Sequence, residues 1–244
     1  MKFKVCFHGD LDFFLKTGSG IKNEFFSQRC TPVKDVIESM GVPHTEIGAI
    51  MAEGEERDFG FLPREGMCIQ VFPVTPPLDI TRPTCLRPEP FGKVLFVADV
   101  NVGKLARLLR IAGFDTAYKN TWSDSTIASV ASREERVVLT KDRNLLKRKV
   151  ITYGRLIRSI RPWDQLEEVI DFFGLREQVF PFRRCPSCNV PLQRIPKTQI
   201  LDRIEPLTRL FFDEFHLCPE CERIYWPGSH YYKIIRKLEK LEKQ

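Results

Sequence analysis

Two pairs of closely spaced cysteines constrain the last quarter of this 244-residue chain more than any other feature of the sequence. Cys185 and Cys188 form the first pair, Cys218 and Cys221 form the second, and 29 residues separate the pairs. Two thiolates three positions apart on a tight turn can face one ion, and two such turns complete a tetrahedron of sulfur ligands. The sequence therefore predicts a structural Zn²⁺ site in a fold of the zinc-ribbon type.

The residues around these cysteines sharpen the prediction. Pro186 and Pro219 stand at matching places inside the two pairs, which indicates that both halves of the site are built alike. Four thiolates leave no open coordination position, so the ion is expected to be structural rather than catalytic. The separation of 29 residues exceeds the commoner ~15–20 and leaves room for a β-hairpin or an extra loop. Two alternatives remain: a pair of redox-active Cys-x-x-Cys motifs, or a site in which His216 or His230 replaces one cysteine.

Composition favours a folded, cytoplasmic protein. The hydrophobic fraction is 43%, which is enough for a folded core. No apolar run approaches the ~20 residues of a membrane span, and the first ten residues hold no apolar stretch typical of a signal sequence. Disulfides are rare in that compartment, so cysteines there are expected to be free thiols or metal ligands. The four remaining cysteines are expected to be isolated thiols: Cys6, Cys30, Cys68 and Cys85.

Charge is divided unevenly along the chain. Residues 1–92 carry 10 Lys and Arg against 13 Asp and Glu, whereas residues 93–244 carry 28 against 19. The second part therefore has a net charge of +9, and its partner is expected to be a polyanion, of which nucleic acid is the usual one. The alternative is a solvated basic surface without a partner.

Residues 1–74 are expected to form a first domain with the order strand, strand, helix, strand, strand. The predicted strands are residues 2–8, a partner strand through Phe13 and Phe14, residues 47–51 and residues 68–72, and the predicted helix spans 32–40 and ends at Gly41. Residues 75–92 then contain five prolines, too many for a sheet or helix to continue. This segment is predicted to be a linker.

Residues 93–180 alternate between strands and helices. Strands are expected at 94–98, 115–118 and 136–140, and helices at 102–112, 123–135 and 163–173. The strands at 94–98 and 136–140 are continuously apolar, which is typical of a parallel sheet covered on both faces. We therefore predict an α/β domain with a mostly parallel sheet, followed by the zinc ribbon at 181–230 and a basic C-terminal helix or tail at 231–244.

Three aspartates are the candidate catalytic residues. Asp99 and Asp142 each follow a buried strand directly, and Asp124 stands at the start of the intervening helix. The carboxyl ends of parallel strands meet at one edge of a sheet, so the three carboxylates are expected there with a hard cation, Mg²⁺ or Mn²⁺, between them. Such a site activates a water and shields the charge on a phosphodiester. The alternative is that Asp124 is only a helix cap and Asp142 only a turn residue.

Basic residues surround these acids. Residues 133–161 contain ten Lys and Arg but three acids, a pattern that suits a phosphate backbone passing over a metal site. A solvated helix face is the alternative. The candidate RNA-binding residues are Lys104, Arg107, Lys141, Arg143 and, beside the first cysteine pair, Arg184.

Several motifs in this order resemble the Mut7-C family. They are FVADVNVGKLARLLRIAGFDTAY, then DSTIASVA at 124–131, RVVLTKDRNLL at 136–146 and the ribbon from Cys185 to Cys221. The resemblance covers roughly residues 93–228 and implies a PIN-like ribonuclease domain, a three-layer α/β fold, with a C-terminal zinc ribbon. Residues 1–74, with HTEIGAIMAEGEERDFGFLPREGMCIQVFPV as the matching part, resemble the ubiquitin-like β-grasp domain (ThiS/MoaD-like) that precedes it in bacterial members.

The resemblance places the family's acidic positions on Asp99, Asp124 and Asp142 and implies metal-dependent cleavage of RNA. PIN nucleases typically gather four acids, and only Glu134 or Glu135 is a candidate for the fourth here. The first domain lacks the terminal Gly-Gly of sulfur carriers, so we expect it to dock a protein or ribonucleoprotein partner. The alternative function is a non-catalytic adaptor that binds RNA or a ribonucleoprotein.

Overall fold

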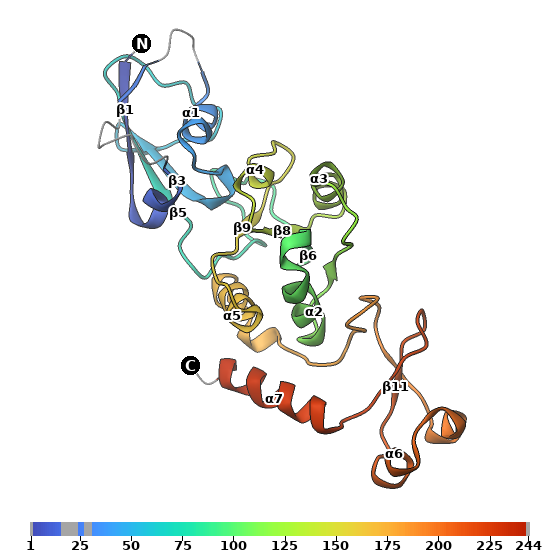
Figure 1. The fold of residues 1–244 in the computed structure, drawn as a ribbon. Coiled ribbons are helices and arrows are strands. Elements are labelled where there is room, and N and C mark those ends of the chain that lie inside the picture. Colours follow the sequence, from blue (N-terminus) through green and yellow to red (C-terminus); the bar gives the residue numbers. More distant parts are fainter. Residues whose placement is uncertain (1, 16–23, 27–30, 243–244) are drawn as a thin grey trace.

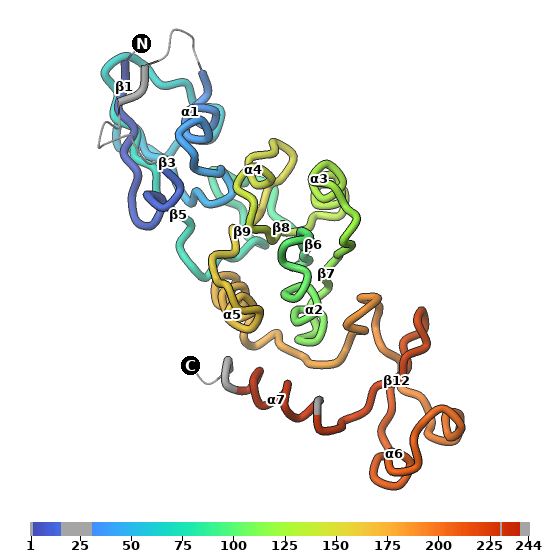
Figure 2. The backbone as a smooth tube through the Cα atoms, viewed as in Figure 1, coloured from blue at the N-terminus to red at the C-terminus, as the bar shows by residue number. Residues whose placement is uncertain are grey.

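The computed structural model describes residues 2–15, 24–26 and 31–242. Three parts follow one another along an elongated molecule: an N-terminal sheet domain, a central α/β domain and a C-terminal ribbon (Figure 1). The last helix turns back from the ribbon toward the central domain, as the course of the backbone shows in Figure 2. No helix in the described part of the chain is long and apolar enough to cross a membrane.

The N-terminal domain is a five-stranded sheet with one helix on it, which confirms the β-grasp prediction. Its elements are β1 (Lys2–Phe7), β2 (Glu24–Phe26), α1 (Val33–Met40), β3 (Ile47–Ala52), β4 (Glu55–Glu56) and β5 (Cys68–Pro73). The strand order is β2-β1-β5-β3-β4, with β1 and β5 parallel and the other pairs antiparallel. Helix α1 ends at Gly41, whose φ of 119° is in the left-handed region that glycine adopts without strain.

The prediction of a strand through Phe13 and Phe14 is wrong. Residues Gly9–Phe14 form a 3-10 helix, η1, and the strand that pairs with β1 on that side is β2. Leu11 and Phe14 are three positions apart and buried, whereas Phe13 is half exposed. Residues three apart lie on one side of a 3-10 helix, so the helix buries both Leu11 and Phe14. In a strand, residues three apart would point to opposite faces.

The central domain has three layers around a four-stranded, wholly parallel sheet, as expected. The strands are β6 (Phe96–Ala98), β7 (Thr116–Ala117), β8 (Val137–Thr140) and β9 (Gly154–Leu156), in the order β7-β6-β8-β9. The helices are α2 (Gly103–Ile111), α3 (Asp124–Arg133), α4 (Arg143–Leu146) and α5 (Pro162–Phe172), with a 3-10 turn, η3 (Val100–Val102), after β6. Strand β9 was not among the predicted strands.

Alternate residues of the sheet strands belong to two different apolar cores. Phe96, Ala98 and Leu139 pack with α2 and α5, whereas Val97 and Val138 pack with α3 and α4. The core on the α3 side continues without a break into the N-terminal domain, where it includes the buried residues of β1, β3, β5 and α1. The first two domains therefore share one hydrophobic core.

The proline-rich segment 75–92 contains no helix or strand, but it is packed against both domains. Ile80 and Phe91 are buried in the core under α2 and α5. Arg87 is also buried, and its guanidinium donates hydrogen bonds to the carbonyl oxygens of His44, Thr45 and Ile47 in the first domain and Thr152 in the second. The segment is thus a fixed strap across the domain junction.

The C-terminal part consists of the ribbon and one long helix. The ribbon strands are β10 (Gln193–Arg194), β11 (His216–Leu217) and β12 (Ile224–Tyr225), which form an antiparallel sheet in that order. The long spacing between the cysteine pairs holds 3-10 turns and α6 (Pro206–Phe211) around a small core of Ile200, Ile204 and Phe215. Helix α7 (Ser229–Glu242) follows, and Leu238 on it is buried in the core of the central domain.

Candidate active site and metal centre

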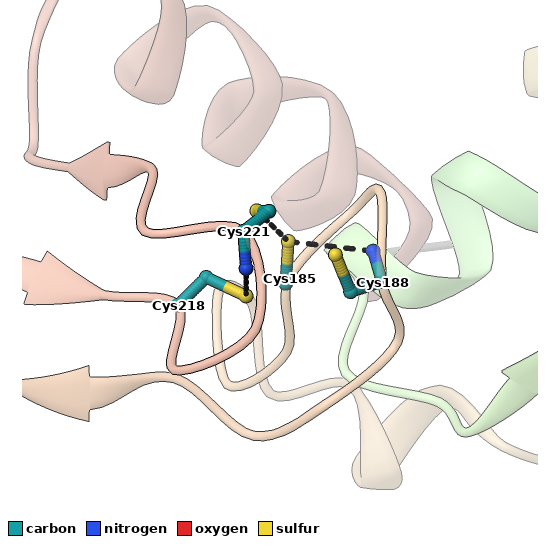
Figure 3. Close-up of side chains that lie close together, drawn as sticks. All are labelled: Cys185, Cys188, Cys218 and Cys221. Atoms are coloured by element: carbon teal, nitrogen blue, oxygen red, sulfur yellow. Dashed lines mark hydrogen bonds between the residues drawn. The ribbon is translucent and has the colours of Figure 1, made fainter.

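The four predicted cysteines meet in one place. The sulfur atoms of Cys185, Cys188, Cys218 and Cys221 all lie within 4.8 Å of one another, and within the described ranges they are the one such group of three or more potential metal ligands (Figure 3). The Cys185 and Cys221 sulfurs are 3.7 Å apart. Tetrahedral bonds of ~2.3 Å to zinc would separate two sulfurs by about 3.8 Å. The cluster could therefore hold a metal such as zinc.

The two halves of the cluster are built alike, as the matching prolines indicated. The Cys188 N–H lies 3.4 Å from the Cys185 sulfur, and the Cys221 N–H lies 3.5 Å from the Cys218 sulfur (Figure 3). Asn189 and Glu222 follow the two pairs with left-handed φ angles of 70° and 54°. Each of these two residues donates its N–H to the carbonyl of the first cysteine of its pair at 2.9 Å. Two equivalent turns thus point four sulfurs at one centre.

The convergence of the four sulfurs suits one bound cation rather than two separate redox pairs. Burial by itself raises the pKa of the Cys185 thiol, but the Tyr225 hydroxyl at 3.2 Å and backbone N–H groups outweigh it and lower that pKa to about 7. The four sulfurs converge on one point, whereas the cysteines of two independent redox pairs would lie apart from each other. His216 lies on β11 and is not a member of the group, and the side chain of His230 is outside the described residues.

Asp99 and Asp142 lie at the same edge of the parallel sheet. They follow β6 and β8, which are neighbouring strands, and the hydroxyl of Thr140 connects them. That hydroxyl donates to Asp99 Oδ2 at 2.6 Å and accepts a hydrogen bond from the Asp142 N–H at 2.9 Å. Alongside, Asn101 Oδ1 accepts from the Lys141 N–H at 3.2 Å. Two acids and two neutral polar groups therefore close the carboxyl ends of β6 and β8.

The two carboxylates differ in their surroundings. Asp99 is only 3% exposed, and its Oδ1 accepts from the Val100 N–H at 2.6 Å at the start of η3. Asp142 is partly exposed and caps α4 by accepting from the Asn144 N–H at 2.8 Å through Oδ1. No hydrogen bond from the described residues reaches Asp142 Oδ2, whereas each Asp99 oxygen accepts one.

Asp124 is the third predicted acid, and it is not joined to the other two. It is the first residue of α3, which Ser123 caps as predicted. The Asp124 side chain is 46% exposed, and its carboxylate lies 4.0 Å from the Arg148 guanidinium. The three aspartates do not form a group close enough to be recognised as a metal site in the described structure. The structure thus brings Asp99 and Asp142 together and leaves Asp124 in an ion pair.

Glu134, one of the two candidates for a fourth acid, lies at the wrong end of the sheet. It forms ion pairs with Arg133 and Arg136, and Arg136 immediately precedes β8. Arg136 also donates to the carbonyl of Phe96, the first residue of β6. These contacts place Glu134, and Glu135 beside it, at the amino ends of the strands, opposite the edge that holds Asp99 and Asp142.

The five predicted RNA-binding residues have different surroundings. Lys104 and Arg107 are exposed on α2 and line a groove of about 320 Å³. Lys141 is exposed, and its ammonium donates to the Ser159 carbonyl at 2.7 Å. Arg143 donates to the carbonyls of Phe13 and Phe14, and Arg184 pairs with Asp115 at 3.2 Å. The last two guanidinium groups are therefore engaged in contacts between parts of the protein.

Sequence reasoning missed the polar residues that connect the acids. Thr140 was assigned only to a strand, although a hydroxyl two positions before Asp142 was a readable signal. It also missed Arg110, whose buried guanidinium donates to the Ser187 carbonyl at 2.6 Å and so fixes the first cysteine turn to α2. The prediction that Cys6 and Cys68 stand alone is wrong, because their sulfurs are 3.9 Å apart on the paired strands β1 and β5.

The fold and the cysteine cluster define a protein with a ubiquitin-like domain, a parallel α/β domain and a zinc ribbon. The sequence model of the Mut7-C RNAse domain matches residues 94–238, and that of the Mut7-C ubiquitin domain matches residues 1–79. The chain therefore belongs to the Mut7-C family, as its motifs predicted. No curated protein and no solved structure matched the chain.

Proposed function

We propose that this protein is a metal-dependent ribonuclease whose reaction takes place at the carboxyl edge of β6 and β8. Membership of the Mut7-C RNAse family supports an activity on RNA. The observation that carries the assignment to this edge is the Thr140 hydroxyl, which links Asp99 and Asp142 on neighbouring parallel strands. Open parallel sheets bind their ligands outside the carboxyl ends of the strands.

The donor set at this edge fits a hard divalent cation. Asp142 Oδ2 has no hydrogen-bond partner among the described residues, and the Thr140 hydroxyl, which accepts from the Asp142 N–H, holds the Asp99 carboxylate in place. Carboxylate oxygens are the ligands that Mg²⁺ and Mn²⁺ prefer, so Asp99 and Asp142 would hold the ion. When bound, the ion would neutralise charge on the scissile phosphate and promote ionisation of a water. Asp124 would join the site after release from Arg148.

In this proposal, basic residues bind the RNA and the four cysteines stabilise the ribbon. Lys104 and Arg107 stand one and two turns along α2 from the acids, and Lys141 stands between β8 and Asp142. Their charges would bind successive phosphates. The four cysteines would hold Zn²⁺ in a closed site, which keeps the ribbon folded and leaves the hydrolysis to the acids.

The test compares two Asp→Asn substitutions in the full chain. Cleavage of an unstructured RNA with Mn²⁺ is expected to fall about 100-fold in Asp142→Asn, because the ligand oxygen loses its charge. Asp35→Asn is the matched control, since Asp35 is also exposed at the start of a helix and lies in the other domain. Equal cleavage by wild type and Asp142→Asn would refute the proposal.

One observation favours the adaptor alternative. Asp124 is paired with Arg148, and Glu134 points to the opposite edge, so fewer acids converge than a PIN nuclease gathers. In this alternative the protein binds RNA and cleaves none. Binding without cleavage in Mg²⁺ and in Mn²⁺, together with unchanged binding in Asp142→Asn, would establish it.

A further inference from the structure

A cavity away from the acidic edge is lined by residues of the ribbon, the residue two positions after α2 and the start of α7. Its volume is about 640 Å³. Aromatic side chains from three segments line it. Phe182 comes before the first cysteine pair, Tyr225 and Trp226 come after the second pair, and Tyr231 lies on α7. Arg183 and His216 add polar groups to the same lining. Neither the acids nor the zinc site uses this cavity directly.

The aromatic rings are held in place from different sides. Phe182 and Tyr231 have ring centroids 4.4 Å apart with planes inclined by 33°, so they form one packed wall. Phe182 has a left-handed φ of 58°, which is unusual for a bulky residue, and its N–H donates to the Ile111 carbonyl at 2.9 Å. Trp226 remains 38% exposed although it is the largest side chain in the lining. An indole that open is available to stack on a ligand.

The charge at the cavity is suited to an anionic ligand. Arg183 lines the cavity and is exposed, and its guanidinium lies 4.3 Å from the centroid of the Phe180 ring. Glu214 is the one acid of the lining. Stacking platforms combined with arginine are how proteins bind single-stranded nucleic acid, because every base has a π face and every nucleotide a phosphate.

A separate groove is lined by residues of α2, α5 and α7. Lys104 and Arg107 line it on α2, Trp163 lines it on α5 and Ile234 lines it on α7. The Lys237 ammonium lies 4.7 Å from the centroid of the Trp163 ring, which adds a cation from α7. Helix α2 begins near Asp99 and ends at the cavity, a length of about 13 Å for its nine residues. Two basic residues of α2, Lys104 and Arg107, thus stand along the helix between Asp99 and the cavity.

We propose that the aromatic cavity binds an unpaired base of a single-stranded RNA whose backbone follows α2 to the acidic edge. This inference rests on the proposed function, since it concerns the same RNA. A base in a duplex is stacked and paired, so its faces are not free to stack on the aromatic side chains of the cavity, such as the exposed Trp226. The cavity would therefore make the protein select single-stranded over double-stranded RNA.

Binding is tested in the full chain carrying Asp142→Asn, without added Mg²⁺ or Mn²⁺, so that no cleavage interferes. The probe is a fluorescent, unstructured RNA of about 12 nucleotides, free or annealed to its complement. Trp226→Ala and Tyr231→Ala are each expected to weaken binding of the single strand about ten-fold and to leave duplex binding unchanged. Tyr232→Ala is the matched control, because Tyr232 is the neighbouring tyrosine, 54% exposed and outside the cavity lining. Wild-type affinity in both cavity variants would overturn the inference, as would equal weakening for the duplex.

A second measurement avoids dependence on variant folding. The same RNA containing thiouridine is crosslinked by light to the Asp142→Asn protein, and the modified peptides are identified by mass spectrometry. Crosslinks at Phe182, Trp226 or Tyr231 support the cavity, and crosslinks confined to α2 and α3 overturn it. If the wild-type protein cleaves RNA and the cavity variants bind RNA with unaltered affinity, the cavity proposal is refuted and the proposed ribonuclease function is not. If those variants lose RNA binding and the wild-type protein cleaves no RNA, the proposed ribonuclease function is refuted and the cavity proposal is not.

Discussion

The N-terminal domain and the zinc ribbon flank the same α/β domain, but they are attached to it by different kinds of contact. The first junction is buried: Glu46 accepts from Arg155 at 2.6 Å and from the Leu156 N–H at 2.7 Å, and an apolar core runs across it. The ribbon has a small core of its own, and side-chain hydrogen bonds join it to the α/β domain: the buried Arg110 donates to the Ser187 carbonyl, and Asp115 accepts from the Asn189 side chain. From this difference we expect the first two domains to unfold as one unit and the ribbon, whose four cysteines could hold a metal, to unfold as a second unit.

The largest loss of stability is expected from Cys218→Ser, which removes one of the four cysteines of the ribbon cluster. The free energy of metal binding in structural zinc sites, about 10–16 kcal/mol, is also folding free energy, so loss of a ligand should unfold the ribbon. Hydrogen exchange should show lost protection in β10 to β12 while β6 and β8 keep theirs. Cys85→Ser is the control, because Cys85 is exposed and outside the cluster. Simultaneous loss of protection in all three parts would contradict the two-unit description.

Glu46→Ala is expected to act on the other junction. It would leave the Arg155 guanidinium buried beside an empty position, which costs about 3–5 kcal/mol. Urea unfolding, followed by far-ultraviolet circular dichroism, should shift to lower concentration with the two domains still unfolding together. Glu55→Ala, an exposed acid paired with Arg57, should change little. A shift in the ribbon alone would argue against the shared core.

Asp115→Asn should produce a smaller loss, confined to the ribbon junction. Asp115 accepts from Arg136 at 2.7 Å and from the Asn189 side chain at 2.8 Å, and removing its charge should cost about 1–3 kcal/mol. Hydrogen exchange at the first cysteine turn is the measurement. Asp213→Asn is the control, since Asp213 is highly exposed and pairs with Lys197. Equal exchange rates in both variants would show that Asp115 does not hold the ribbon.

The smallest loss of stability is expected at the ribbon junction when the pH is lowered. Burial raises the pKa of Asp115, but hydrogen bonds from Arg136 and Asn189 outweigh it and hold that pKa below its usual value. A lowered pKa stabilises the folded state above about pH 4 and loses that contribution as pH falls through the folded-state pKa. The protection of junction amides, measured as the ratio of the intrinsic to the observed exchange rate, should therefore fall below about pH 4 in the wild type and depend less on pH in Asp115→Asn.

Local signals in the sequence predicted local structure well. Gly41 ends α1 and Ser123 caps α3 because each position depends on the chemistry of one turn. The cysteine cluster was predictable because a metal imposes a fixed spacing on its ligands. The α/β order of the central domain followed from continuously apolar strands at 94–98 and 136–140.

Contacts between distant segments could not be predicted in the same way. The proximity of Cys6 and Cys68 depends on the pairing of β1 with β5, and the aromatic cavity depends on how α7 runs from the ribbon back to the central domain. The ion pair of Asp124 with Arg148 likewise depends on where α4 ends. A single sequence specifies the strands but not the position of one element against another. The candidate acids were therefore found one by one, and their arrangement required the structure.

The strap at 75–92 crosses between the domains in both directions. Ile80 comes before the exposed turn 81–85 and is buried in the central domain, whereas Arg87 comes after that turn and binds carbonyls of the first domain. A protease that cuts the turn would therefore leave each fragment anchored in the other. The nicked protein should elute from a sizing column as a single species and separate into two bands only in detergent.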